Sequence, residues 1–179
     1  MVGLDGQDIV IVYNKKRKVV IFMMKIMKDK WARNEKHLKQ VFETRTDLNT
    51  IDWSDLVKLT FEYIYNIDYD DFDDDESLNL NNITIIDNGD YQGTLLFIIP
   101  FKTYQPAEYD YLMTYVWYGS CSGCDALQEA QDYFEENNKL TEQQIKDFLK
   151  LAKDIICNTI KPYNNGWREE EDFREENVK

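Results

Sequence analysis

The stretch ITIIDNGDYQGTLLFIIPF (residues 83–101) predicts an antiparallel pair of strands. The β-branched run 83–86 leads into DNGD (residues 87–90), and Asn-Gly supplies the positive φ angles that a tight hairpin turn requires. The next run, 95–99, is apolar without a break, as is typical of a strand that is buried on both faces. Pro100 ends this strand because proline cannot donate to a β-ladder.

Helical patterns lie on both sides of this hairpin in the sequence. We expect a third strand at 109–118 and helices at 29–45, 52–65, 124–134 and 140–160. Thr50 and Asp52 are candidate caps for the second helix, and Thr141 with Gln144 forms a capping-box pattern at the last one. Because helices and strands are segregated along the chain, the predicted fold class is α+β, with an antiparallel sheet of three or more strands flanked by N-terminal and C-terminal helices.

The first 24 residues allow two interpretations. The β-branched runs 9–12 and 19–22 around a polar connection predict an N-terminal β-hairpin. Alternatively, Met23, Met24 and Met27 each precede a helical pattern, and a natural start there would make the first residues an extension of the reading frame. The expected organisation is an extension or hairpin at 1–22, a single α+β domain at 23–163 and an acidic, mobile tail at 164–179.

Length and composition indicate a cytoplasmic protein without a membrane segment. The 179 residues suit one domain, and no apolar run of about 18 residues is present. Charged residues interrupt the apolar residues near the N-terminus, so the layout of a signal peptide is missing. Three cysteines form no dense framework, which favours a reduced compartment, here the cytoplasm of a bacterial host cell.

The net charge of −13 is unevenly distributed along the chain. Residues 1–46 contain 11 Lys+Arg against 5 Asp+Glu, whereas the remaining residues contain 10 against 29. Such a body repels nucleic-acid phosphates and is attracted to a basic groove of another protein, although solubility alone also explains the charge.

The segment IDYDDFDDDES (residues 67–77) concentrates seven acids in eleven residues and predicts a solvated loop. It fails as an EF-hand loop, because Glu76 stands where Gly is needed and Asn82 where Glu is needed. We expect its carboxylates to bind a basic partner surface. They are Asp68, Asp70, Asp71, Asp73, Asp74, Asp75 and Glu76.

Basic residues near the N-terminus are candidates for contact with nucleic-acid phosphates. The alternative is that they fold against the acidic body of the protein. The candidates are Lys15, Lys16, Arg17, Lys18, Lys28, Lys30 and Arg33.

The motif YGSCSGCD (residues 118–125) has four interpretations. Cys121 and Cys124 with Cys157 and His37 make four zinc ligands, but Cys157 follows two isoleucines and is expected to be buried. The C-x-x-C spacing also occurs in redox pairs, and a glycine-rich turn between strand and helix can bind an anion. The fourth and favoured interpretation is a structural corner at which Ser122 or Asp125 caps a short helix. No metal or other cofactor is expected.

No arrangement of residues predicts catalysis. One histidine without a nearby nucleophile pattern leaves no triad, and the many acids single out no dyad. We therefore expect a non-enzymatic protein.

Several strings resemble a family of short proteins encoded in phages and prophages of Firmicutes and in gut metagenomes. They are GDYQGT (89–94), FIIP (97–100), TYQP (103–106), YGSCSGCD (118–125), RTDLNTIDWSDLVKLTFEYI (45–64) and PYNNGW (162–167). The resemblance covers residues 31–167, and residues 1–22 depart from the usual start of such proteins.

The resemblance implies a biological setting but assigns no catalytic residue. Small acidic phage proteins are often inhibitors of host defence, including anti-CRISPR proteins that occupy a basic nucleic-acid channel. The expected function is inhibition of a host defence nuclease, in particular a type II CRISPR effector bound to guide RNA. Alternatives are a small metal- or phosphate-binding protein that uses the Cys121–Cys124 turn, and a structural or replication accessory protein of a phage.

Overall fold

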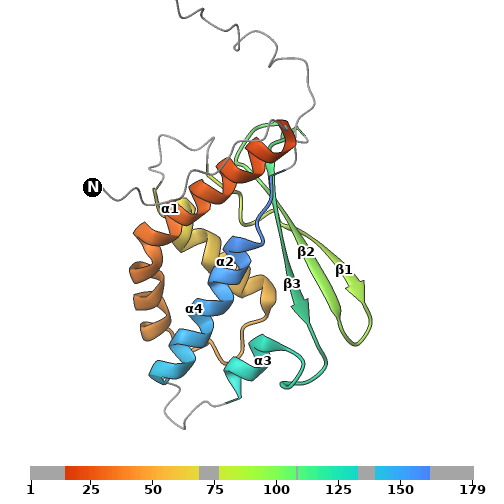
Figure 1. Cartoon of the computed structure of the whole chain (residues 1–179). Helices are drawn as coiled ribbons and strands as arrows, with labels where there is room; N and C mark the ends of the chain where they lie inside the picture. The colour runs from red at the N-terminus through yellow and green to blue at the C-terminus, as the bar shows by residue number, and fades with distance from the viewer. Residues whose placement is uncertain (1–14, 69–76, 108, 133–139, 162–179) are drawn as a thin grey trace, which may run out of the picture.

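The computed structural model describes residues 15–68, 77–107, 109–132 and 140–161 and confirms the α+β fold (Figure 1). The described elements, in chain order, are α1 (Lys15–Thr44), α2 (Trp53–Ile64), the 3-10 helix η1 (Asn66–Asp68), β1 (Thr84–Gly89), β2 (Gly93–Pro100), β3 (Tyr111–Tyr118), α3 (Ala126–Gln131) and α4 (Glu142–Cys157). The predicted tail at 164–179 and the first predicted strand at 9–12 lie outside the described residues.

The three strands form one antiparallel sheet in the order β1-β2-β3. The register pairs Phe97 with Thr114 and Ile99 with Leu112, so these four side chains share one face, and all are fully buried. The helices lie on this side of the sheet, with α4 in contact with both β3 and α1 (Figure 1).

The helices bury a continuous apolar core against this face. Phe42 of α1 packs on Phe148 of α4 with 5.7 Å between the ring centroids, and both are fully buried. Phe61 of α2 and Ile155 of α4 also belong to this cluster. Each such side chain contributes about 1.5–3 kcal/mol relative to exposure, so apolar burial holds the helical layer together.

Helices α2 and α4 begin directly after the predicted capping residues Asp52 and Thr141. The side chain of Asp52 accepts a hydrogen bond from Asp55 N (2.9 Å) at the start of α2. At α4, Gln144 N donates to Thr141 Oγ1 (3.2 Å), and Thr141 N donates to Gln144 Oε1 (3.0 Å). Both are capping boxes, in which two otherwise unpaired N–H groups are satisfied reciprocally.

The predicted position of the hairpin turn is wrong by a few residues. Asn88 and Gly89 belong to β1, where they pair with Thr94 and Gly93, and the turn comprises residues 90–92. The two glycines are needed for close approach of the strands, since a Cβ on Gly93 would lie 2.6 Å from Asn88 O.

The predicted N-terminal hairpin is also wrong over its second strand. Residues 19–22 lie within α1, which runs without interruption from Lys15 to Thr44. Although the β-branched run favours a strand locally, extending an existing helix adds a hydrogen bond for each residue that is fixed. Anchors such as Trp31, Leu38 and Phe42, which are buried further along α1, provide the helix that is extended.

The motif at 118–125 forms the predicted structural corner between β3 and α3. The carboxylate of Asp125 caps α3 by accepting from Leu127 N (2.9 Å) and Gln128 N (3.3 Å). Gly119 is buried, and a Cβ there would overlap the Cys124 carbonyl and lie 2.7 Å from Cys124 Sγ. The corner therefore requires glycine at 119 but not at 123, where an added Cβ meets nothing within 4 Å.

Gly119→Ala should lower the free energy of unfolding by about 1–3 kcal/mol, because the corner must shift to admit the methyl group. Gly123→Ala is the matched control and should change it little. Chemical denaturation of both variants measures the difference. Equal stability of the two variants would contradict the close packing at Gly119.

Candidate functional site

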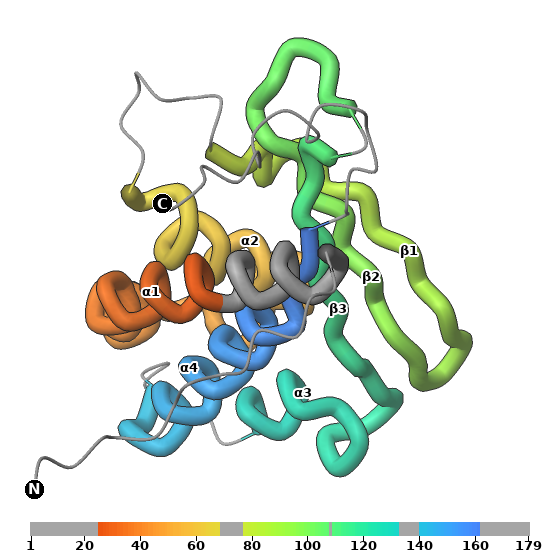
Figure 2. Tube along the Cα trace, turned by 45° about the horizontal axis from the view of Figure 1, so that its top comes forward, coloured from red at the N-terminus to blue at the C-terminus, as the bar shows by residue number. Residues whose placement is uncertain are grey.

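The face of the sheet that points away from the helices is apolar and exposed. Alternation along the strands places Ile86, Leu96, Ile98, Met113, Tyr115 and Trp117 on this outer face. Trp117 is 66%, Ile86 48% and Tyr115 46% exposed. Within the described parts of the chain, no helix crosses this face (Figure 2).

The prediction that the run 95–99 is buried on both faces is wrong. Phe97 and Ile99 are buried, but Leu96 and Ile98, which point the other way, are only half-buried. Exposed apolar patches of this kind commonly mark interaction sites.

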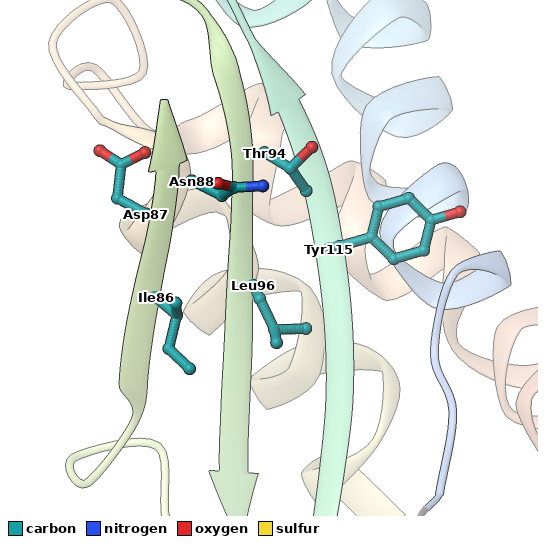
Figure 3. Close-up of a pocket in the computed structure, with 6 residues that line it drawn as sticks. All are labelled: Ile86, Asp87, Asn88, Thr94, Leu96 and Tyr115. Atoms are coloured by element: carbon teal, nitrogen blue, oxygen red, sulfur yellow. The ribbon is translucent and has the colours of Figure 1, made fainter. Parts of the chain in front are cut away.

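A shallow groove of about 500 Å³ lies across the three strands on the outer face. Figure 3 shows Ile86 and Leu96 side by side, with Tyr115 on the neighbouring strand. Asn88 and Thr94 border this apolar floor with polar groups, and Asp87 completes the lining.

The strands that form this groove lack positively charged residues. No Lys, Arg or His occurs in β1, β2 or β3, and Asp87 lines the groove from β1 although the register directs its side chain to the inner face. On the inner face, the hydroxyl of Tyr118 donates to Asp87 Oδ1 (2.7 Å), and this bond raises the pKa of Tyr118. With exposed aromatic rings and no basic residue in its strands, the groove suits apolar or cationic side chains of a partner.

Hydrogen bonds join the two residues that flank the acidic segment. Asn66 Nδ2 donates to Leu78 O (2.9 Å), and Leu78 N donates to Asn66 Oδ1 (2.8 Å). Leu78 also forms a β-bridge with Phe101, which follows β2. Six of the predicted partner-binding acids lie between these ends, outside the described residues: Asp70, Asp71, Asp73, Asp74, Asp75 and Glu76.

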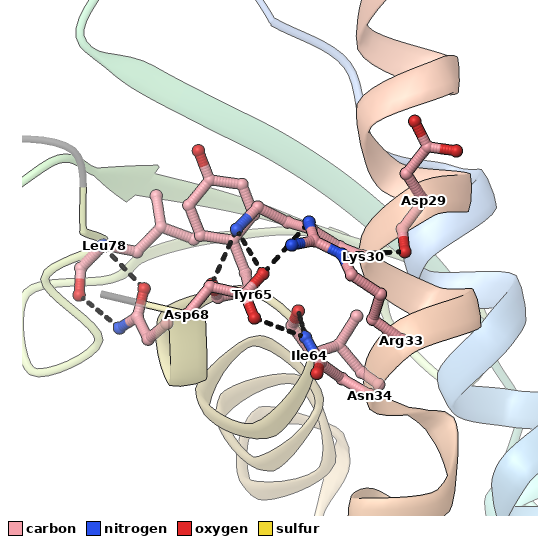
Figure 4. A network of polar contacts seen from close by, with 9 residues as sticks. Asp29, Lys30, Arg33, Asn34, Ile64, Tyr65, Asp68 and Leu78 are labelled. Atoms are coloured by element: carbon pink, nitrogen blue, oxygen red, sulfur yellow. Dashed lines mark hydrogen bonds and ion pairs between the residues drawn. The ribbon is translucent and has the colours of Figure 1, made fainter. Parts of the chain in front are cut away.

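The seventh acid, Asp68, takes part in an internal network with α1 (Figure 4). Its carboxylate accepts from Lys30 Nζ (3.1 Å) and Asn34 Nδ2 (3.1 Å) and pairs with Arg33 Nη2 (3.2 Å). The ammonium group of Lys30 also donates to Tyr65 O (3.0 Å) and lies 4.3 Å from the centroid of the Tyr65 ring.

This network removes Lys30 from the predicted nucleic-acid contacts, because its side chain is only 5% exposed. Arg33 is 61% exposed but paired with Asp68, in line with the alternative that basic residues fold against the acidic body. Lys28 is exposed. The backbone of residues 15–18 is helical, but their side chains lie outside the described part of the structure.

Asp68→Asn should destabilise the fold by about 1–2 kcal/mol at neutral pH, because the buried Lys30 ammonium loses its counter-charge. Burial raises the pKa of Asp68, but hydrogen bonds from Asn34 and Lys30 outweigh it and hold this pKa below its usual value. The difference in unfolding free energy between wild type and variant should therefore shrink as pH falls from about 4, the usual carboxyl range, through the lowered pKa of folded Asp68.

Denaturation curves at several pH values test this dependence. Glu35→Gln, which removes the charge of an exposed acid on α1, is the control and should leave stability nearly unchanged. A deficit of Asp68→Asn that persists undiminished at pH 2 would contradict the role of the charge.

The four candidate zinc ligands do not gather at one place. Of the four, Cys121 and Cys124 lie together, with 2.6 Å between their Sγ atoms. Among the described residues, no three or more His, Cys, Asp or Glu side chains are close enough together to bind one metal ion. The expectation that Cys157 is buried is wrong: it is the last residue of α4 and exposed. His37 is exposed and stacks on Tyr63.

Several N–H groups that a bound anion would need at this corner are already occupied. Gly119 N, at the end of β3, donates to the carboxylate of Asp125 (3.2 Å). The N–H groups of Leu127 and Gln128 at the start of α3 bond to the same carboxylate. An acidic side chain of the protein thus takes the place of a phosphate.

Sequence reasoning missed the outer face as a site. The pattern of YLMTYVWY predicts a strand but does not by itself place the aromatic residues on an exposed surface. The alternation of Tyr115 and Trp117 with buried Thr114 and Val116 was the signal that could have revealed it.

None of the described helices combines the length and the apolar character needed to cross a membrane. The chain matches no protein-family model, no curated protein and no solved structure.

Proposed function

We propose that this protein is a non-enzymatic binding protein whose outer sheet face docks on an apolar and basic surface of another protein. The observation that carries the proposal is the uncovered sheet face, on which Tyr115 and Trp117 are exposed beside an apolar groove. Tyr and Trp are the residues most enriched at the energetic centres of interfaces.

The charge of the chain supports a basic partner. A net charge of −13 disfavours direct binding to nucleic acid and steers association toward cationic surfaces. The two ends of the acidic segment meet at Leu78, which forms a β-bridge with Phe101 just after β2. Trp117 pairs with Thr94, near the other end of β2. The partner surface that fits is an apolar patch next to a basic channel.

Nucleases that bind nucleic acid have such channels. Together with the resemblance to phage proteins, this supports a host defence nuclease as the partner, in particular a type II CRISPR effector bound to guide RNA. In this proposal the protein acts in the bacterial cytoplasm and blocks the effector by occupying its nucleic-acid-binding surface. Exposed basic residues of α1 such as Lys28 then lie free to contact the guide RNA.

Trp117→Ala combined with Tyr115→Ala should weaken binding to the effector–guide complex at least about ten-fold, because it removes two aromatic contacts. Tyr104→Ala is the matched control, since Tyr104 is fully exposed but lies outside the strands. Calorimetry or surface plasmon resonance measures affinity, and a DNA-cleavage assay measures protection. The proposal fails if the wild-type protein binds no effector–guide complex and protects no target DNA.

Neutralising the acidic segment should weaken binding and flatten its salt dependence, because screened charge–charge attraction is lost. The variant changes Asp70, Asp71, Asp73, Asp74 and Asp75 to Asn. Affinity measured across a range of salt concentrations gives the slope. If affinity and slope are unchanged, the acidic segment is not part of the interface.

A further inference from the structure

We propose that Cys121 and Cys124 form a thiol–disulfide exchange site, which reversibly closes a disulfide at the β3–α3 corner by reaction with low-molecular-weight disulfides. The proposal is independent of the binding function proposed above. The two thiols lie at the β3–α3 corner and belong neither to the outer face nor to the acidic segment.

The backbone holds the two cysteines in position before any bond forms. Cys124 N (2.9 Å) and Asp125 N (2.8 Å) both donate to Cys121 O, so the segment from Cys121 to Cys124 is a closed turn. Such a turn keeps its end Cα atoms within about 7 Å, and disulfides span Cα distances of about 4.4–6.8 Å. The Sγ atoms lie 2.6 Å apart, and both residues are exposed to an incoming reagent.

The surroundings of the two sulfur atoms differ, and this assigns their roles. Cys121 N donates to Cys124 Sγ (3.1 Å), which stabilises a thiolate at Cys124. The hydrogen bond with Cys121 lowers the pKa of Cys124, and the same contact raises the pKa of Cys121. Cys124 is therefore the attacking thiolate, and Cys121 keeps its proton until the second step.

The exchange balances without any further reagent. The Cys124 thiolate attacks one sulfur of a disulfide RS–SR, whose S–S bond breaks; a mixed disulfide forms on Cys124, and RS⁻ leaves and takes up a proton. Cys121 then loses its proton and attacks Cys124 Sγ, which expels the second RS⁻. Two protein thiols are oxidised to one disulfide, and one disulfide is reduced to two thiols.

The corner can undergo this change because the bonds of Asp125, which hold the neighbouring elements together, do not involve the sulfur atoms. Asp125 fixes the end of β3 through Gly119 N and fixes α2 through Trp53 Nε1 (3.3 Å). The side of Gly123 is open, so the turn has room to adjust. A bond between the two sulfur atoms thus forms and breaks while the surrounding contacts remain.

Cys157 provides an internal control, because it is exposed like the other two cysteines but lies at the end of α4. The experiment treats the full chain with oxidised glutathione near neutral pH and follows each cysteine by mass spectrometry with peptide mapping. We expect the 121–124 peptide to lose two hydrogen atoms, and Cys157 to carry only a glutathione adduct. Reaction at Cys124 should be about ten-fold faster than at Cys157.

Single serine variants separate the two steps. Cys121→Ser should trap the glutathione adduct on Cys124, Cys124→Ser should slow reaction at Cys121 to the rate of Cys157 or below, and Cys157→Ser should leave closure unchanged. Circular dichroism checks that each variant is folded. Accumulation of stable glutathione adducts on both Cys121 and Cys124 of the wild type, without an internal disulfide, would overturn the proposal.

Discussion

The arrangement of sheet and helices depends on one buried carboxylate, that of Asp125, which is 4% exposed. Four N–H groups donate to it, from Gly119 at the end of β3, from Leu127 and Gln128 in α3, and from the Trp53 side chain at the start of α2. Burying a charge is costly unless hydrogen bonds replace its hydration shell, so these four donors must stay together for the fold to be stable. The carboxylate thereby fixes one end of the sheet against the helical layer.

A single layer of helices can cover only one face of the sheet, and this limit creates the candidate site. The inner face buries Phe97, Ile99 and Leu112, whereas the opposite face keeps its aromatic residues in solvent. Leaving Trp117 exposed gains nothing for folding, because its apolar surface remains in water. Its exposure is explained if the surface of a partner covers it.

The sequence predicted those features that depend on local interactions. The caps Asp52 and Thr141 and the corner at Asp125 were readable because each bonds to N–H groups two or three residues away. The N-terminal run 19–22 was misjudged because its local strand preference is overridden by a helix anchored further along the chain. The contact of Lys30 with Asp68 and the exposure of the outer face were not readable, since they depend on which distant elements meet. A continuous apolar run such as 95–99 does not tell which of its faces lacks a neighbour.

The edge strand β1 has a consequence for how this protein behaves at high concentration. All six of its residues are exposed, Ile85 and Ile86 among them, and no described strand pairs with its outer edge. Natural sheets usually guard such an edge with lysine or proline, but β1 contains neither and carries Asp87 instead. Mutual repulsion between strongly anionic copies is then what keeps one edge from pairing with another. That protection is lost near the isoelectric point of about 4.5, so mild acid is the condition under which the folded protein would aggregate through its own sheet.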